Sequence, residues 1–173
     1  HYYQTHGRDW ERYAWIRARV VAGDHDAGLS FLEMLRPFIY RRYLDFSALG
    51  SLREMKSMIN AEVRRGGLED NIKTGPGGIR EVEFLAQAFQ LVRGGRLPAL
   101  RGREVIPVLE RLAEYELLPQ FATRSLADAY RFLRTLEHRL QQVEDQQLHT
   151  LPQGERDRAR IALSLGFETW GNL

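Results

Sequence analysis

Residues 71–93 read NIKTGPGGIREVEFLAQAFQLVR, and this stretch contains the features that decide the fold. From Ile79 onward, apolar residues recur every three to four positions, which is the spacing of one face of an α-helix. Glycines precede this run, and the pair Gly94-Gly95 follows it, so the helix has a stop signal at each end. The stretch therefore predicts a loop over residues 69–78 and a helix over residues 79–92.

The same helical spacing extends over the rest of the chain, whereas the alternation typical of strands is nearly absent. We therefore predict an all-α protein, a bundle of about six to seven helices. Pro37 is expected to kink or split the second helix. The loop at residues 94–102 is the best boundary, which predicts one helical sub-bundle over residues 1–96 and a second over 97–173. The expected helices cover about 9–21, 29–44, 49–65, 79–92, 104–115, 123–147 and 154–165.

Composition excludes several classes of function. The chain has 173 residues, 43% of them hydrophobic, no cysteine, and a formal net charge of +2. The lack of cysteine excludes disulfides and thiolate metal sites, and fits a cytoplasmic protein. No apolar run reaches the roughly 20 residues that span a bilayer, and the small net charge argues against a nucleic-acid partner. Because the chain begins with His1 rather than Met, we expect it to be part of a longer protein.

The first predicted helix places Arg17 in the middle of an apolar face. A guanidinium there has to be paired or reach water, because burying it alone is too costly. Arg17 therefore either points at a phosphate or carboxylate or pairs with a structural glutamate, and the residues alone favour the structural role. The opposite face carries arginines and is expected to be solvated. The apolar face comprises Trp10, Tyr13, Ala14, Val20 and Val21, and the opposite face Arg8, Arg12, Trp15 and Arg19.

The loop before residue 79 has the composition of an anion site. Gly77 and Gly78 let the backbone approach a ligand, and the helix that follows directs free N–H groups and a positive dipole end toward it. Lys73 and Arg80 add positive charge on either side. The spacing is not that of a P-loop or a dinucleotide-binding motif, and a tight turn with a capped helix start explains the residues equally well. We predict no catalytic residue and no metal ligand, because no such constellation is present.

The helix over residues 79–92 is apolar nearly all round, and its polar residues form one narrow stripe: Arg80, Glu83, Gln87 and Gln90. Buried polar groups need partners. The stripe is therefore expected to face a polar network or a cleft.

Several long runs resemble one family, the glutamine synthetase adenylyltransferases, which add AMP to glutamine synthetase and remove it. The match covers nearly the whole chain. The runs are YYQTHGRDWERYA (2–14), LRPFIYRRYLDF (35–46), SLREMK (51–56), KTGPGGIREVEF (73–84), FQLVRGGR (89–96) and HTLP (149–152).

The resemblance implies the half of the enzyme that takes AMP off a glutamine synthetase tyrosine by phosphorolysis, giving ADP. It also implies Mg²⁺ and ATP or ADP in the whole enzyme, held mainly on a nucleotidyltransferase sheet that precedes this region. The chain would then be a helical companion domain, inactive alone, with Arg17, Lys73, Gly77, Gly78 and Arg80 at a phosphate or nucleotide. Two differences from the family weaken the assignment of these residue roles. Position 17 is Arg where the family often has Lys, and Pro76 stiffens the loop.

Another function remains open from the residues. The helices would then be a non-catalytic docking module for glutamine synthetase or the PII signalling protein. The direction of the loop from Lys73 to Arg80 separates the two: a loop that lines a cleft favours chemistry, and one packed inside the bundle favours structure.

Overall fold

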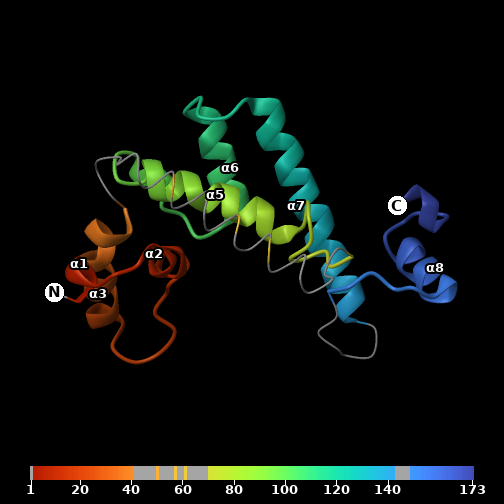
Figure 1. The fold of residues 1–173 in the computed structure, drawn as a ribbon, viewed down its shortest axis with the longest axis horizontal. Coiled ribbons are helices and arrows are strands. Elements are labelled where there is room, and N and C mark those ends of the chain that lie inside the picture. Colours follow the sequence, from red (N-terminus) through yellow and green to blue (C-terminus); the bar gives the residue numbers. More distant parts are fainter. Residues whose placement is uncertain (1, 41–49, 51–56, 58–60, 62–69, 143–148) are drawn as a thin grey trace. The chain divides into compact units, whose positions relative to one another are not determined.

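The computed structural model describes residues 2–40, 50, 57, 61, 70–142 and 149–173 (Figure 1). The prediction of an all-α protein is confirmed. Within these residues the chain forms α-helices, two short 3-10 helices and one isolated β-bridge, with no strand. The predicted helix over residues 49–65 lies almost entirely outside the described residues.

The chain forms two compact units, and each draws on two separate stretches. The first unit combines His1–Lys56 with Phe84–Thr123, and the second combines Ser57–Glu83 with Arg124–Leu173. This grouping differs from the predicted division at residue 96, because the long helices that link the stretches contribute residues to both units.

The first unit begins with α1 (Tyr2–Thr5), α2 (Asp9–Ile16) and α3 (His25–Ile39). Helix α2 is five residues shorter than the predicted helix over 9–21, since the N–H groups of Arg17 and Ala18 bond i−3 carbonyls and close the last turn. These helices enclose a core of Ile16, Leu35, Phe38, Ile39 and Tyr40, against which Tyr3, Trp15 and Leu91 pack.

Helix α3 begins four residues before its predicted start. The Asp24 carboxylate caps it by accepting a hydrogen bond from the Ala27 N–H at 3.0 Å, and Asp26 lies in its first turn. Pro37 lies inside the helix and does not split it. The helix ends at Ile39, because Tyr40 has an extended backbone, so the predicted end at residue 44 is wrong.

The remaining helices lie close to their predicted positions. Helix α5 spans Ile79–Arg93, and α6 spans Val105–Glu114 after a 3-10 turn, η1 (Pro98–Leu100). Helix α7 spans Gln120–Gln141, and α8 spans Glu155–Ser164, followed by η2 (Trp170–Asn172).

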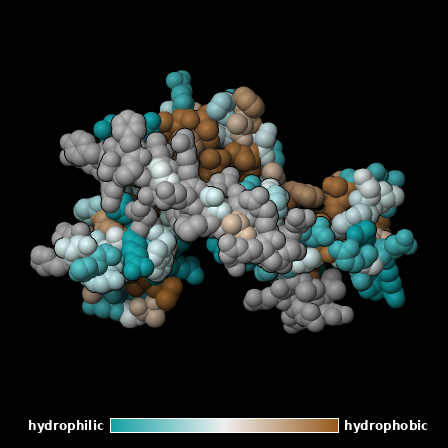
Figure 2. All heavy atoms as spheres, viewed as in Figure 1, coloured by the Kyte–Doolittle hydropathy of each residue, from teal (hydrophilic) through white to brown (hydrophobic). Residues whose placement is uncertain are grey.

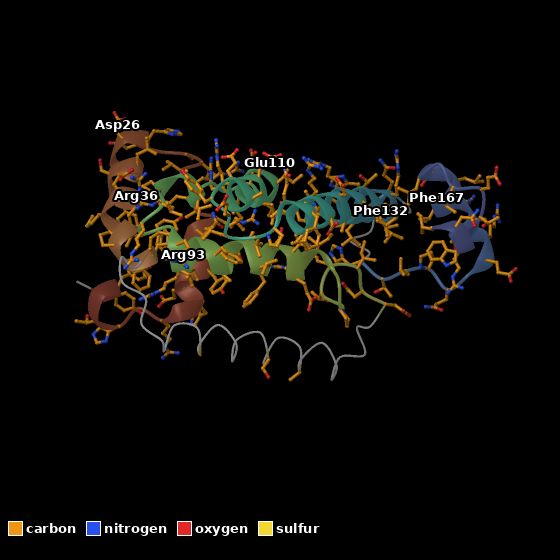
Figure 3. The ribbon with its side chains drawn as sticks, turned by 90° about the horizontal axis from the view of Figure 1, so that it is seen from above. Asp26, Arg36, Arg93, Glu110, Phe132 and Phe167 are labelled. Carbon is orange, nitrogen blue, oxygen red and sulfur yellow. The ribbon has the colours of Figure 1, made fainter. Side chains whose placement is uncertain are left out.

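The second unit has its own core, formed by Ile72, Leu136, Leu140 and Ile161. The rings of Phe132 on α7 and Phe167 after α8 pack edge to face with centroids 6.4 Å apart (Figure 3). The guanidinium of Arg158 lies over the Trp170 ring. The phenylalanine contact holds the carboxy-terminal segment against α7, and the Arg158–Trp170 contact joins α8 to η2.

Candidate functional site

The loop that precedes α5 is shaped by the Asn71 side chain. Its Oδ1 accepts hydrogen bonds from the N–H groups of Lys73 and Thr74, each at 3.0 Å, and its carbonyl accepts one from the Gly75 N–H at 2.7 Å. Asparagine favours such turns because its side chain mimics a backbone carbonyl. The turn fixes the backbone at Lys73.

A distant segment pairs with the start of this loop. The Ile72 N–H donates to the His149 carbonyl at 2.8 Å, and the Leu151 N–H donates to the Asp70 carbonyl at 3.1 Å. Residues Asn71 and Thr150 form an isolated antiparallel bridge between these contacts. The pairing brings the side chains of His149 and Lys73 together, with 3.5 Å between Nε2 and Nζ.

Lys73 and His149 both face a buried carboxylate on α7. Oε1 of Glu137 lies 3.3 Å from Lys73 Nζ and 3.2 Å from His149 Nδ1, and Oε2 accepts a hydrogen bond from Arg134 Nη1 at 2.6 Å. The two contacts at Oε1 are close in distance but lack hydrogen-bond angles, so we treat them as electrostatic. The Glu137 side chain is 2% exposed, so this carboxylate needs the cations around it.

Sequence reasoning missed Glu137 and His149. A signal for Glu137 was present, since it lies beside Leu136 and one turn before Leu140 on the apolar face of α7. A carboxylate in that position demands a cation. No pattern in the sequence signalled His149, because its place depends on the bridge between two distant segments.

The backbone donors of the predicted anion loop have partners inside the loop. Gly77 has a φ of +73° and donates its N–H to Glu81 Oε2 at 3.2 Å. The next three N–H groups donate to carbonyls: Gly78 to Gly75 at 3.0 Å, Ile79 to Ile72 at 2.9 Å and Arg80 to Lys73 at 2.9 Å. The Arg80 side chain is exposed, and no ion pair joins it to another described residue.

The structure thus gathers four of the five predicted site residues in the loop and the first turn of α5: Lys73, Gly77 and Gly78 lie in the loop, and Arg80 is the second residue of the helix. Arg17 belongs to the other unit, where it follows the last residue of α2 and is partly buried. An anion role for these five residues stays a prediction.

The polar stripe of α5 has partners at two of its four positions. Tyr130 donates its hydroxyl hydrogen bond to Glu83 Oε1 at 3.2 Å. Gln90 Nε2 donates to the carbonyls of Leu100 at 2.7 Å and Gly102 at 2.5 Å. For Glu83 and Gln90 the expected polar network is confirmed.

No group of three or more histidine, aspartate or glutamate side chains among the described residues lies close enough together to hold a metal ion. No helix in the same part of the chain is both long and apolar enough to cross a membrane.

The sequence matches known proteins along nearly its whole length. Residues 1–34 match the family model for glutamate-ammonia ligase adenylyltransferase, and residues 53–172 match the model for GlnD PII-uridylyltransferase. The chain is 59% identical over 172 residues to the bifunctional glutamine synthetase adenylyltransferase/adenylyl-removing enzyme of Xanthomonas axonopodis pv. citri, covering 99% of this chain and 18% of that protein. Proteins of the same name from Nitrosococcus oceani and Pseudomonas syringae pv. tomato are 58% and 56% identical, covering 98% and 99% of this chain and 17% and 18% of their own lengths.

Proposed function

Because the chain belongs to the family of bifunctional glutamine synthetase adenylyltransferases/adenylyl-removing enzymes, we propose that it is the helical companion of the unit that removes AMP. In this proposal phosphate displaces AMP from a tyrosine of glutamine synthetase and ADP is released. The observation that carries it is 59% identity, over 99% of the chain, to a relative whose name includes both activities. GRDWER (7–12) and GGIRE (77–81) resemble the forms found in the removing half of the family, and this resemblance supports that half over the adding half.

The loop geometry supports a structural role for the GGIRE segment (77–81). A Cβ on Gly78 would lie 2.7 Å from the Ile72 carbonyl oxygen and 2.9 Å from that of Gly75, so only glycine fits without moving backbone. This close packing sets the start of α5 and presents Arg80 to solvent. Arg80 is therefore the residue of the predicted anion site most available to a phosphate.

Lys73 has a different part in the proposal. Its ammonium lies 3.3 Å from the buried Glu137 carboxylate, so its charge is already used within the unit. We assign to Lys73 the positioning of the loop backbone. Gly77 and Gly78 act in the same way, since their N–H groups are engaged. Arg17 belongs to the first unit and stays a separate candidate for contact with an anion.

Mg²⁺ and ATP or ADP belong to the proposal for the whole enzyme, which we place in the cytoplasm. The described residues gather no carboxylate cluster for the metal. We expect this chain alone to release no ADP from adenylylated glutamine synthetase.

The test exploits the two activities of the family in one protein. Arg80→Gln in the intact enzyme is expected to lower phosphate-dependent ADP release about ten-fold or more, while AMP addition stays within two-fold of wild type. Arg156→Gln is a matched control, because Arg156 is also an exposed arginine at the second position of a helix, α8. Equal loss of both activities, or no loss of removal, contradicts the assignment of the loop to the removing half.

A second candidate function is docking of glutamine synthetase or the PII signalling protein. Apolar side chains on or next to α2 and α3 are exposed, among them Trp10, Val21, Leu29 and Met34, and Figure 2 shows apolar groups among polar ones over this part of the chain. Exposed apolar groups of this size often mark protein contacts. Met34→Glu is expected to weaken binding of the intact enzyme to one of these two partners and to leave its melting temperature unchanged. Unchanged affinity for both partners contradicts docking at this surface.

A further inference from the structure

The first unit contains a pocket of about 320 Å³ between α2, α3 and the segment after η1. Four arginines line it, namely Arg19, Arg36, Arg101 and Arg103, together with His25. No aspartate or glutamate belongs to the described lining. In a chain with a net charge of only +2, this is a strong local excess of positive charge.

Arg101 is held in place by the backbone. Its Nε donates to the Gly94 carbonyl at 2.7 Å and its Nη2 to the Gly95 carbonyl at 3.4 Å, while the guanidinium lies 5.2 Å from the centre of the Tyr40 ring. Among the described residues Nη1 has no hydrogen-bond partner. A guanidinium fixed in this way loses little conformational entropy when it binds an anion.

Arg36 lies in the last turn of α3 (Figure 3), and its one ion pair within the described residues is at the surface. It pairs with Glu33 one turn earlier, and the two side chains are 49% and 55% exposed. Pairs this exposed contribute little free energy, so a ligand anion can replace the glutamate. Arg36, Arg101 and Tyr40 line the same pocket, and the two guanidinium charges oppose the rise that burial causes in the pKa of the Tyr40 phenol.

Arg19 and Arg103 are exposed and form no ion pair within the described part of the chain. The rest of the lining is largely apolar and includes Trp15, Leu29 and Leu32. The pocket thus combines several cations with an apolar wall, and its volume suits a small molecule.

We propose that this pocket binds a small phosphate ester, with the phosphate among the arginines and an apolar body against Trp15 and Leu29. A phosphate has three terminal oxygens and up to two negative charges, and so can engage several guanidiniums at once. A carboxylate has two oxygens and a single charge, which one arginine satisfies. The site lies in a different unit from the loop at Lys73, and it does not depend on the function proposed above.

The test uses four probes with the intact protein in titration calorimetry. Phenyl phosphate carries both the anion and the apolar body, inorganic phosphate lacks the body, phenol lacks the anion, and benzoate has a carboxylate instead. We expect phenyl phosphate to bind most tightly and its affinity to fall as salt rises. Equal affinity for phenyl phosphate and benzoate, or no binding of phenyl phosphate, overturns the proposal.

Variants locate the binding. Arg36→Gln is expected to raise the Kd for phenyl phosphate about ten-fold. Arg111→Gln is the matched control, since Arg111 also pairs with a glutamate one turn away, at 51% and 56% exposure, in the same unit and outside the pocket. Its Kd should stay within two-fold of wild type. Because both arginines are exposed, melting temperatures should not change. If Arg36→Gln and wild type bind phenyl phosphate with equal Kd values, the ligand binds outside this pocket and the proposed site is refuted.

Discussion

Nζ of Lys73 lies 3.3 Å from Oε1 of Glu137, a carboxylate whose side chain is 2% exposed. Arg134, one turn earlier on α7, donates to the other oxygen at 2.6 Å. A carboxylate this deeply buried is costly unless cations compensate it. Lys73 therefore links the loop before α5 to α7. Replacing it is expected to lower the stability of the second unit, whether or not a ligand binds.

Replacement of Lys73 by methionine keeps an unbranched side chain of nearly the same length and removes the charge. We expect Lys73→Met to lower the free energy of unfolding by about 1–3 kcal/mol, because Glu137 then loses one of its two full cations. Urea unfolding measures the change. Arg131→Met is the control, since Arg131 pairs with Asp128 on the exposed side of the same helix, and its effect should stay within about 0.5 kcal/mol.

The double variant Lys73→Met/Glu137→Leu completes a thermodynamic cycle. Removing both partners leaves no buried charge to compensate, so the double variant should be more stable than the sum of the two single changes indicates, by at least about 0.5 kcal/mol. Strict additivity of the single effects contradicts the pairing.

Gly77 and Gly78 are adjacent but need glycine for different reasons. At Gly78 a Cβ meets two backbone oxygens within 3 Å, whereas at Gly77 there is open space and only the φ of +73° is restrictive. We expect Gly78→Ala to cost about 1–3 kcal/mol of unfolding free energy. Gly77→Asn should cost less than about 1 kcal/mol, because asparagine tolerates this conformation. Equal effects in urea unfolding contradict the distinction.

Helical periodicity predicted the type and approximate place of most elements. Helices α5, α6 and α8 end within two residues of their predicted limits. Helix α7 ends earlier than residue 147, at Gln141. The division into units was beyond sequence reasoning, because it depends on contacts between stretches far apart in the chain.

The faces of α2 show a clear failure of sequence reasoning. Arg12 was expected on a solvated face, but its side chain is 8% exposed and its guanidinium lies 5.0 Å from the centre of the Phe38 ring. Trp10, which the sequence places on the apolar face, is exposed. The ring of Phe38 on α3 provides a surface for the arginine, and such a tertiary contact has no signature in the helix itself.

The candidate site was predictable only in part. The glycines and the polar stripe of α5 indicated a constrained loop and buried hydrogen bonds, both of which the structure contains. The partners of Lys73 were not predictable, since Glu137 and His149 lie 64 and 76 residues further along the chain.

Because of the Tyr40 phenol, the free energy of unfolding is expected to vary with pH in the alkaline range. Burial raises its pKa above the ordinary value of 10.0, against the opposing charges of Arg101 and Arg36. Above pH 10 the unfolded chain therefore loses this proton first, and the free energy of unfolding falls as pH rises toward the raised pKa; below pH 10 the contribution is fully present.

Tyr40→Phe removes this ionisation. We expect the variant to lose stability less steeply than wild type above pH 10, as measured by urea unfolding at a series of pH values. Tyr115→Phe is the control, because Tyr115 is exposed, and it should keep the wild-type steepness. A Tyr40→Phe profile parallel to wild type contradicts the prediction.

Gln90 closes the loop between α5 and α6. Its side chain is 2% exposed, and Nε2 donates to the carbonyls of Leu100 and Gly102 at 2.7 and 2.5 Å. Gln90→Leu keeps most of the volume but leaves both carbonyls without this donor. We expect a loss of about 2 kcal/mol of unfolding free energy. Gln87→Leu, a partly buried glutamine of the same polar stripe, should change it by less than about 0.5 kcal/mol.

Gln90→Glu separates the hydrogen bonds from packing. The carboxylate would face two carbonyl oxygens, and its ionised form has no hydrogen to donate. At pH 8 Gln90→Glu should therefore be less stable than both wild type and Gln90→Leu. At pH 5 a larger fraction of this buried acid holds its proton and donates one hydrogen bond, so the deficit relative to wild type at the same pH should shrink. A deficit that does not change between pH 8 and pH 5, together with full stability of Gln90→Leu, would show that the loop is held by packing and not by these two hydrogen bonds.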